Sequence, residues 1–320
     1  MLRFLLSLLP GRLHSAILRA RGHQIGAGAQ IGFGSILQVD QIELGAGAKV
    51  GPFVHVRAER LVLDSKATIK PLTTLSAGHI HLGHSARIGM LNIASSDVTL
   101  KSNRLVLGAH AQTFPFCWLD PGHGITLGER TGLGGHGLVF THGSWSNYFR
   151  GAPVAFGPVN IGARVWIPWR VFILPGVTIG DDAIIAGGSV ITKDVPAGSL
   201  AGGSPAKVIR EKANAFIDED ELRKRLDFVL SAIMTQPWAT RRLVQTSHTG
   251  PSLTQVPADV YFGANLSAHE RATLSGRGAT VVDVVSEKAW LGTDSAAGLR
   301  VISWLTRYGV RCDVQEGSAE

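Results

Sequence analysis

The sequence predicts a mainly β chain wound into a coil of short parallel strands, and two spacings predict this fold. The first is a phrase of two aliphatic residues around one spacer, usually followed by glycine. It begins at Ile42, Leu61, Ile80, Val98, Ile125, Val159 and Val177. The steps between these positions are 19, 19, 18, 27, 34 and 18 residues. Steps of 18 or 19 residues predict one turn of the coil, and the two long steps predict insertions.

The second spacing lies inside each step, where aliphatic residues recur every six positions. It is clearest in the run Ile161, Ile167, Ile173, Ile179, Ile185 and Ile191. A helix has a period of about 3.6 residues and a half-buried strand a period of about 2, so neither explains this run. A three-sided coil with one inward aliphatic residue on each side does explain it. Each turn would bond only to its two neighbours, so both open ends of the stack must be covered.

The composition fits such a coil and excludes some classes of function. The 39 glycines among 320 residues follow the repeat and form no low-complexity tract. The two cysteines, Cys117 and Cys312, lie far apart, which is typical of a reducing compartment and argues against structural zinc. The net charge of +7 fits an anionic ligand, but no block of consecutive Lys and Arg indicates a nucleic-acid partner.

Residues 1–24 are expected to form an amphipathic helix. Its apolar run, Phe4–Leu9, is too short for a membrane-spanning helix and short for a signal peptide. Two interpretations stay open: the helix caps the first turn of the coil, or it lies on a membrane surface. On a membrane, leucines would face lipid and arginines would face phosphates: Leu5, Leu8, Leu9, Leu13, Arg3, Arg12, Arg19 and Arg21. The chain is expected in the cytoplasm, either free or at the inner face of the cell membrane.

Residues 25–210 resemble the hexapeptide-repeat acyltransferases, whose fold is a left-handed parallel β-helix. The resemblance is strongest over Val159–Arg210, which reads VNIGARVWIPWRVFILPGVTIGDDAIIAGGSVITKDVPAGSLAGGSPAKVIR. It implies an acetyl-CoA co-substrate, no metal, and a homotrimer with its sites between subunits. One departure is Pro168-Trp169, which stands where the family has glycine and leaves the local turn open.

The second long step, from Ile125 to Val159, exceeds one 18-residue turn by about 16 residues and predicts a loop. Long loops on rigid scaffolds often carry function. His142 stands at the start of this loop, and in the resembling family a histidine there is the general base. A neutral imidazole can accept the proton that an attacking hydroxyl or ammonium group loses. Asp120 and Glu129 are two candidates for orienting the ring.

The resemblance also implies which residues contact coenzyme A. Small residues would let the thiol arm of the cofactor approach the backbone, and basic residues would face its phosphates. The candidates are Trp166, Ala186, Gly187, Lys193, Ala201, Gly202, Pro205, Lys207 and Arg210.

The first long step, from Val98 to Ile125, predicts a second irregular segment over Leu105–Pro121. This segment contains Phe114, Phe116, Cys117 and Trp118. Its aromatic side chains either contact a sugar or lipid carrier, or pack against the C-terminal part of the chain.

The remainder is expected to form a helix and polar linker over 211–257 and a small α/β domain over 258–320. The helix would span Glu211–Met234. Predicted elements of the domain are strands at Asp259–Ala264, Thr280–Val285 and Val310–Val314 and a helix at Asp294–Tyr308. The segment has no glycine-rich phosphate loop, so we expect it to stabilise the trimer or dock a partner.

The resemblance therefore implies acetyl transfer to a sugar hydroxyl or amine of a cell-surface polysaccharide precursor. The acceptor would be a sugar, a sugar nucleotide or a lipid-linked glycan. Two alternatives stay open. A γ-class carbonic anhydrase shares the fold and binds zinc through three histidines, with His136 and His142 as candidate ligands. Five further histidines are available to it: His79, His81, His84, His110 and His123. The other alternative is a non-catalytic β-helix that serves as an assembly platform.

Overall fold

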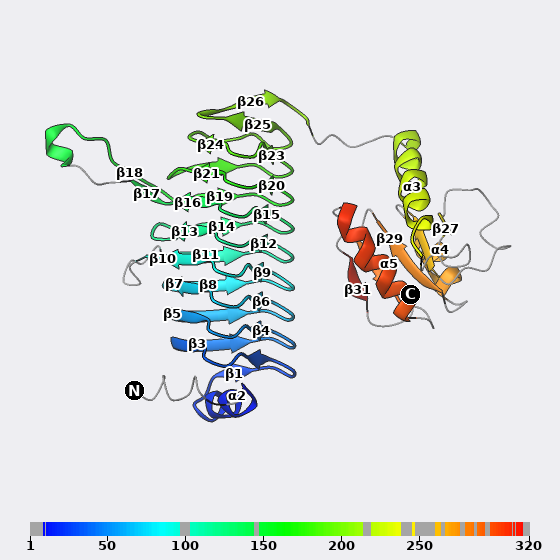
Figure 1. The fold of residues 1–320 in the computed structure, drawn as a ribbon, viewed down its shortest axis with the longest axis horizontal. Coiled ribbons are helices and arrows are strands. Elements are labelled where there is room, and N and C mark those ends of the chain that lie inside the picture. Colours follow the sequence, from blue (N-terminus) through cyan, green and yellow to red (C-terminus); the bar gives the residue numbers. More distant parts are fainter. Residues whose placement is uncertain are drawn as a thin grey trace. The chain divides into compact units, whose positions relative to one another are not determined.

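The computed structural model describes residues 9, 11–96, 103–143, 147–213, 219–237, 245–246, 260–263, 266–275, 279–284, 287–291, 295–308, 310 and 312–315. The chain divides into two compact units, Met1–Ala215 and Phe216–Glu320. Figure 1 shows a stack of coils in the first unit and a small mixed sheet with helices in the second. Each unit is described by itself.

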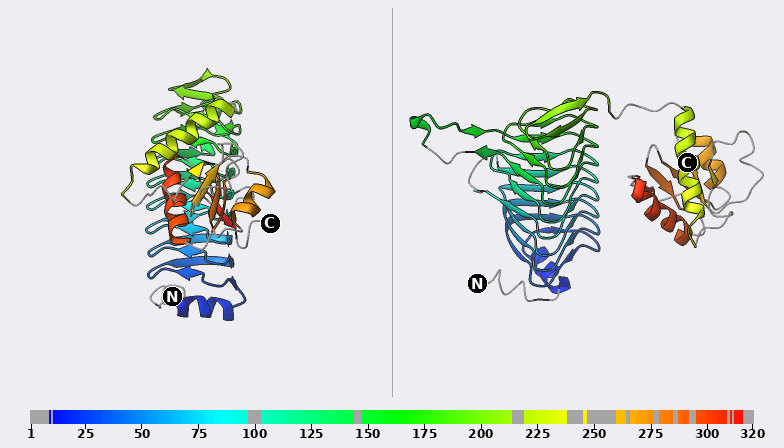
Figure 2. Two further views of the ribbon diagram at one scale, coloured as in Figure 1. Left: turned by 90° about the vertical axis from the view of Figure 1, so that its right-hand side faces the viewer. Right: turned by 45° about the horizontal axis from the view of Figure 1, so that its top comes forward.

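The first unit is a β-helix with three faces, on each of which parallel strands of successive coils are stacked; the last strand of the second face, β26, is antiparallel (Figures 1 and 2). The first face consists of β1 (Gln24–Ile25), β3 (Ile36–Leu44), β5 (His55–Leu63), β8 (His79–Leu82), β11 (Arg104–Leu107), β14 (Ile125–Leu127), β19 (Val159–Ile161) and β22 (Thr178–Ile179). The second consists of β2 (Gln30–Ile31), β4 (Lys49–Val50), β6 (Thr68–Ile69), β9 (Arg87–Ile88), β12 (Gln112–Thr113), β15 (Gly132–Leu133), β20 (Trp166–Ile167), β23 (Ile184–Ile185), β25 (Leu200–Gly203) and β26 (Ala206–Arg210). The third begins with the first halves of the long strands β3 and β5 and continues with β7 (Thr74–Ser76), β10 (Ile93–Ser95), β13 (Trp118–Asp120), β16 (Leu138–Phe140), β21 (Phe172–Ile173) and β24 (Val190–Ile191).

The core of this unit is a column of inward aliphatic side chains. One coil contributes Ile125, Leu133 and Val139, all 0% exposed, and the next coil places an aliphatic residue directly against each of them. Burying a side chain of this size stabilises the fold by about 1.5–3 kcal/mol. The structure thus confirms the left-handed parallel β-helix that the six-residue period and the family resemblance predicted.

The corners of the coils adopt a left-handed backbone conformation even where the residue is not glycine. At Arg130, for example, φ is 57°. Such a conformation costs free energy for a residue with a side chain. It is supported by the neighbouring coil, because the Arg130 N–H donates to the Ala109 carbonyl at 2.8 Å. The corners of successive coils are therefore aligned.

The prediction that a coil begins at Val98 is wrong. Leu105 pairs with Ile80 on one side and Ile125 on the other, so the next coil begins with β11. Residues 97–102, which include Val98, lie outside the described residues. Leu105–Pro121, predicted to be irregular, instead supplies the regular strands β11, β12 and β13. The phrase Leu105-Val106-Leu107 has the same aliphatic pattern as Val98-Thr99-Leu100, and the pattern alone did not distinguish them.

Helix α2 (Gly11–Ala20) covers the first open end of the β-helix. Its His14, Ser15 and Leu18 are buried, and the Arg19 side chain donates to the Ile25 carbonyl at 3.1 Å. The predicted capping role is therefore confirmed. Residues 1–8 and the Arg12 side chain, on which the membrane interpretation also depends, lie outside the described residues. No helix within the described ranges is long and apolar enough to cross a membrane.

The opposite end is covered by β26, which folds back antiparallel on β25. The predicted helix at Glu211–Met234 is shorter in the structure: Glu211–Ala213 form a turn, 214–218 lie outside the described residues, and α3 spans Glu219–Met234.

The second unit is built around the sheet β27 (Gln245–Thr246), β28 (Val260–Gly263), β29 (Thr280–Asp283), β30 (Lys288–Trp290) and β31 (Asp313–Gln315), in that order. Its helices are α3, α4 (Ala268–Ser275), α5 (Ser295–Leu305) and the 3-10 turn η2 (Thr306–Tyr308). Buried side chains of α3, among them Leu226 and Ile233, join the core of this sheet. β27 lies where the sequence predicted a linker, and α4 and β30 were not predicted. Asp259, Ala264, Val285 and Asp294, which bounded predicted elements, lie outside the described residues.

Candidate active site

The long loop predicted after Ile125 leaves the β-helix at the corner between the third and first faces. β16 ends at Phe140, and β19 resumes the helix at Val159. Between them, β17 (His142–Gly143) pairs antiparallel with β18 (Ala155–Phe156) and forms the base of a projecting arm (Figures 1 and 2). A 3-10 turn, η1 (Tyr148–Arg150), forms the far part of the arm. Residues 144–146 lie outside the described residues.

His142 is paired with Asp120 at the base of this arm. The Nδ1 atom of His142 contacts the Oδ2 atom of Asp120. Asp120 ends β13, the strand stacked beneath β16, and the register places it opposite Phe140. The aspartate side chain is 5% exposed, and the histidine side chain is 51% exposed. A buried carboxylate therefore contacts the inner nitrogen of an accessible imidazole.

The backbone around this pair is fixed by Thr141. Its hydroxyl donates to the Asp120 carbonyl at 2.7 Å and accepts the His123 backbone N–H at 2.9 Å. The Gly122 N–H donates to Asp120 Oδ1 at 3.3 Å. These bonds hold the turn after β13 against the strand that carries His142.

The hydrogen bond to Asp120 also selects a tautomer of His142. A carboxylate accepts a hydrogen bond, so Nδ1 carries the proton of the neutral ring and Nε2 keeps its lone pair. The lone pair is thus on the nitrogen that points away from the carboxylate. This is the arrangement by which a carboxylate prepares an imidazole to act as a base.

Of the two carboxylates that the sequence offered for orienting His142, the structure selects Asp120. Glu129 lies at the corner between the first and second faces, where its Oε1 accepts from Arg130 Nε at 3.1 Å. Thr141 was not identified from the sequence. Its position immediately before His142 was the one available signal.

The predicted coenzyme A segments gather at the corner between the second and third faces in the last coils. The Ala186 N–H donates to the Ala201 carbonyl at 2.8 Å. A Cβ on Gly202 would lie 2.6 Å from the Ala186 Cβ, so only glycine fits there. Gly187 is less crowded, because its Cβ would meet nothing closer than 3.6 Å. Pro205 follows in the turn to β26.

The three predicted basic residues lie at two places. Lys207 and Arg210 are exposed on β26, next to the glycine-rich segments. Lys193 is exposed just after β24, at the same corner as His142 and two coils beyond it. Lys193 therefore lies at the corner of the β-helix that carries His142, whereas Lys207 and Arg210 lie near Gly202.

Trp166 is in β20 on the second face, with its ring against Phe114 at 5.8 Å between centroids. The unusual Pro168-Trp169 pair does not disturb the coil, because the following Arg170 has a φ of 61° like other corner residues. The Trp169 ring covers Gly135, where a Cβ would lie 2.4 Å from it.

The structure separates the predicted site residues into two groups within one chain. The first group lies on the second face and at the corner between the second and third faces, and it contains Trp166, Ala186, Ala201 and Gly202. His142 lies at the next corner, between the third and first faces. Strands of the third face lie between these corners. One chain therefore presents the imidazole and the glycine-rich segments at separate places.

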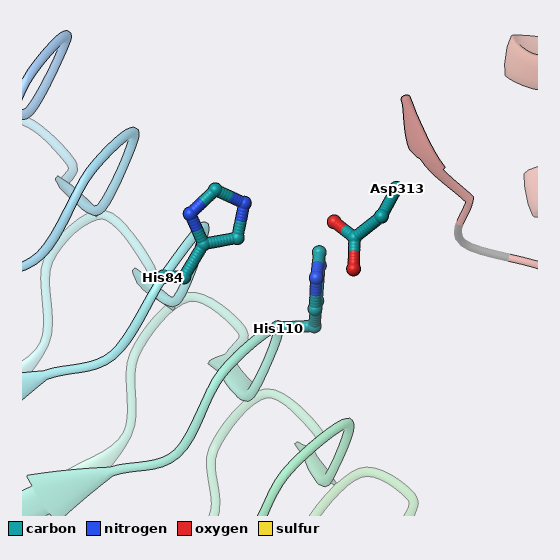
Figure 3. A group of neighbouring side chains, drawn as sticks. All are labelled: His84, His110 and Asp313. Atoms are coloured by element: carbon teal, nitrogen blue, oxygen red, sulfur yellow. The ribbon is translucent and has the colours of Figure 1, made fainter. Parts of the chain in front are cut away.

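The two histidines named first for a zinc site, His136 and His142, are not brought together. His136 and His142 lie on either side of β16, and the His136 ring stacks on Phe116 at 5.1 Å. Figure 3 draws His84 and His110 from consecutive coils, with ring centroids 5.5 Å apart, and Ser65 Oγ lies 2.6 Å from His84 Nδ1. Asp313, also drawn there, belongs to the second unit. This geometry does not favour a zinc site formed by His136 and His142.

Comparison with known proteins identifies the repeat. The family described as bacterial transferase hexapeptide (six repeats) matches residues 158–193. Galactoside O-acetyltransferase of Escherichia coli K12 is 54% identical over 54 residues, which is 17% of this chain and 27% of that protein. The curated relatives are matched over less than half their length, for example 29% and 44%.

Solved structures with a similar fold include a hexapeptide-repeat acetyltransferase of Vibrio cholerae complexed with acetyl coenzyme A. It is 30% identical, with 42% of this chain and 70% of that chain covered and a TM-score of 0.36. UDP-N-acetylglucosamine acyltransferase of Campylobacter jejuni is 20% identical, with coverage of 68% and 82% and a TM-score of 0.41.

Proposed function

This chain belongs to the bacterial transferase hexapeptide family, and from this premise we propose that it is an acetyl-CoA-dependent acetyltransferase. The acceptor is a hydroxyl or amine of a sugar in a cell-surface polysaccharide precursor. The observation that carries the proposal is the pairing of the exposed His142 ring with the buried Asp120 carboxylate at the base of the arm.

His142 is the general base of the proposed reaction. Its Nε2 takes the proton of the acceptor hydroxyl while the hydroxyl oxygen attacks the thioester carbonyl. The carbon–sulfur bond then breaks, and the departing coenzyme thiolate takes the proton from His142 and leaves as a thiol. Asp120 stabilises the imidazolium that forms in between. A positioned base of this kind accelerates a reaction by about 10²–10⁴-fold.

Coenzyme A would lie along the glycine-rich corner of the last coils. The absence of a side chain at Gly202 allows close approach to the backbone. Lys207 and Arg210, exposed beside it, would bind the phosphates through charge-assisted hydrogen bonds. The same corner would be lined by Ala186, Gly187, Ala201, Pro205 and Trp166. Lys193 lies at a different corner and would contact the cofactor from there.

A homotrimer explains how two separated groups of residues form one site. Within one chain, strands of the third face lie between His142 and Gly202. If three parallel β-helices assemble around an axis, the arm corner of one copy meets the glycine-rich corner of the next. Lys193 supports this arrangement, because it lies at the His142 corner and would then face the cofactor held by the neighbouring copy.

A sugar acceptor is supported by an aromatic side chain beside the pair. Trp118 stands two residues before Asp120 in β13, and its side chain is on the same outward face and 49% exposed. An exposed indole can pack against the apolar face of a sugar ring. The galactoside O-acetyltransferase among the relatives supports the same acceptor class.

The proposal is tested by thiol release from acetyl-CoA. The wild-type protein is assayed with a panel of simple sugars, sugar nucleotides and lipid-linked glycans, and each product is identified by its mass. Burial raises the pKa of Cys117 to about 11, so its thiol will contribute little to the signal. Acceptor-dependent thiol release that is lost in His142→Ala supports the proposal. No acetyl-CoA binding at millimolar concentration would refute it, and zinc-dependent hydration of carbon dioxide would favour the carbonic anhydrase.

A further inference from the structure

A second histidine, His123, lies in the turn that follows Asp120. The turn is closed by the Gly124 N–H, which donates to the Pro121 carbonyl at 2.9 Å. The backbone N–H of His123 donates to Thr141 Oγ1, also at 2.9 Å. His123 is therefore fixed to the residue directly before His142.

The ring of His123 is on the side of the arm that carries the His142 ring. Phe156 is directly opposite His142 in the β17–β18 pair. Directly opposed residues in an antiparallel pair place their side chains on one face, with Cβ atoms about 5 Å apart. The Phe156 ring lies against the His123 ring, with centroids 5.3 Å apart and planes tilted by 43°. The rings of His142, Phe156 and His123 are thus neighbours.

The environment of the His123 ring distinguishes its two nitrogens. Nδ1 is buried and has no hydrogen-bond partner among the residues that the structure describes. In a neutral imidazole one nitrogen donates and the other accepts. Either tautomer leaves Nδ1 buried without a partner among these residues, but an unpaired buried N–H donor is rarer in folded proteins than an unpaired acceptor. The neutral ring therefore carries its proton on Nε2, at the opposite end.

We infer that His123 binds the acceptor substrate, donating its Nε2–H to a substrate oxygen next to the hydroxyl that His142 deprotonates. This inference rests on the proposed function. The two imidazoles have opposite roles: His142 has an available lone pair at Nε2 because Asp120 holds its Nδ1–H, and His123 has an available proton there. Phe156, 56% exposed, offers its ring to the apolar face of the same acceptor.

The inference is tested by kinetics of His123→Phe and His123→Gln on the sugar that the wild-type protein acetylates fastest. Phenylalanine keeps a ring against Phe156 and removes the donor, whereas glutamine keeps a donor. Loss of one hydrogen bond predicts that His123→Phe raises the acceptor KM about 3- to 10-fold. The acetyl-CoA KM and kcat should change less than twofold. His123→Gln should recover part of the acceptor affinity, and His81→Phe, on a distant coil, should match the wild-type protein.

Three results would overturn the role of His123: an unchanged acceptor KM in His123→Phe, an equal rise in the acetyl-CoA KM, or a loss of kcat as large as in His142→Ala. Calorimetric titration of the same sugar in the presence of free coenzyme A measures binding without turnover. If no sugar is acetylated, the proposed function fails, and methyl β-galactoside serves as the probe. Weaker binding of this probe by His123→Phe than by wild type would then still support the inference. Equal binding, or none to either protein, would overturn it.

Discussion

Two Asp–His pairs in the described part of the β-helix join adjacent coils, and of these two the Asp120–His142 pair has the geometry of a base. Asp64 Oδ2 lies 3.2 Å from His81 Nε2, and both side chains are about half exposed, at 44% and 46%. The Asp120 carboxylate, in contrast, is 5% exposed beside His142. Water screens the first pair, so it contributes about 0–1 kcal/mol. Burial of the carboxylate makes the second pair the stronger electrostatic interaction.

The two pairs also use different ring nitrogens. His81 contacts its aspartate through Nε2, the outer nitrogen, which is the one that a substrate would reach. His142 contacts Asp120 through Nδ1 and leaves Nε2 for a substrate. The surroundings differ as well, since His81 is inside the regular strand β8 and His142 begins the projecting arm. The same two residue types therefore form a solvent-exposed pair in one coil, and in another a pair with a buried carboxylate and an accessible Nε2.

The largest expected effect separates the two histidines. His142→Ala should lower kcat for acetyl transfer by about 10²–10⁴-fold, because no positioned group then accepts the acceptor proton. His81→Ala should keep kcat within twofold of the wild-type value. Steady-state thiol release measures both, with melting temperatures to confirm that both variants fold. Full activity in His142→Ala would show that another group is the base.

The second comparison is between the carboxylates. Asp120→Asn keeps the shape of the side chain but can present an N–H to His142, which favours the wrong tautomer of the ring. We expect a fall in kcat of about 10²-fold, with little change in the acetyl-CoA KM. Asp64→Asn is the matched control and should leave kcat unchanged. If both variants lose activity equally, the burial of Asp120 is not what distinguishes the pairs.

The six-residue period was sufficient to predict a three-sided coil of short strands, because one buried aliphatic residue on each face leaves few other arrangements, and the family resemblance added its left-handedness. It was less informative about register. Val98 and Leu105 both begin an aliphatic pair, and the structure shows that Leu105 is the residue stacked on Ile80. Which phrase enters the core depends on how much chain the preceding corner holds, and the pattern does not specify that length.

For the candidate site, the sequence offered His142 together with two candidate partners and did not distinguish between them. Asp120 and Glu129 both precede His142 in the sequence, and nothing in the sequence favoured one over the other. The difference between them is their corner: Asp120 ends a strand of the third face directly before the corner with the arm, and Glu129 lies at the next corner. The separation of His142 from Gly202 within one chain came from the structure, since a linear sequence does not show which corner a glycine occupies.

A smaller effect is expected for the residue that fixes the backbone of the pair. Thr141→Val removes the hydroxyl that bonds the Asp120 carbonyl and the His123 N–H. We expect kcat to fall about 3- to 10-fold, and the free energy of unfolding to fall by about 1–3 kcal/mol because buried groups lose partners. Thr73→Val is the control, since the Thr73 hydroxyl is a buried donor to the Gly89 carbonyl at 2.8 Å in another coil. Thr73→Val should lower the free energy of unfolding by a similar amount and leave kcat unchanged. If it also lowers kcat, the loss of activity in Thr141→Val is explained by lost stability alone.

The smallest effect concerns a third histidine, which is 2% exposed in the capping helix α2. Burial lowers the pKa of His14 from its ordinary value of 6.5, so the folded protein favours the neutral ring. The unfolded chain binds the proton more readily, and the stability that His14 contributes is therefore present above pH 6.5 and lost as the pH falls below it. The melting temperature of the wild-type protein should fall between pH 7.5 and pH 5.5 by more than that of His14→Gln. The exposed His81→Gln should follow the wild-type curve. Parallel curves for His14→Gln and wild type would mean that the cap tolerates a charged His14 and that burial does not control the protonation of this ring.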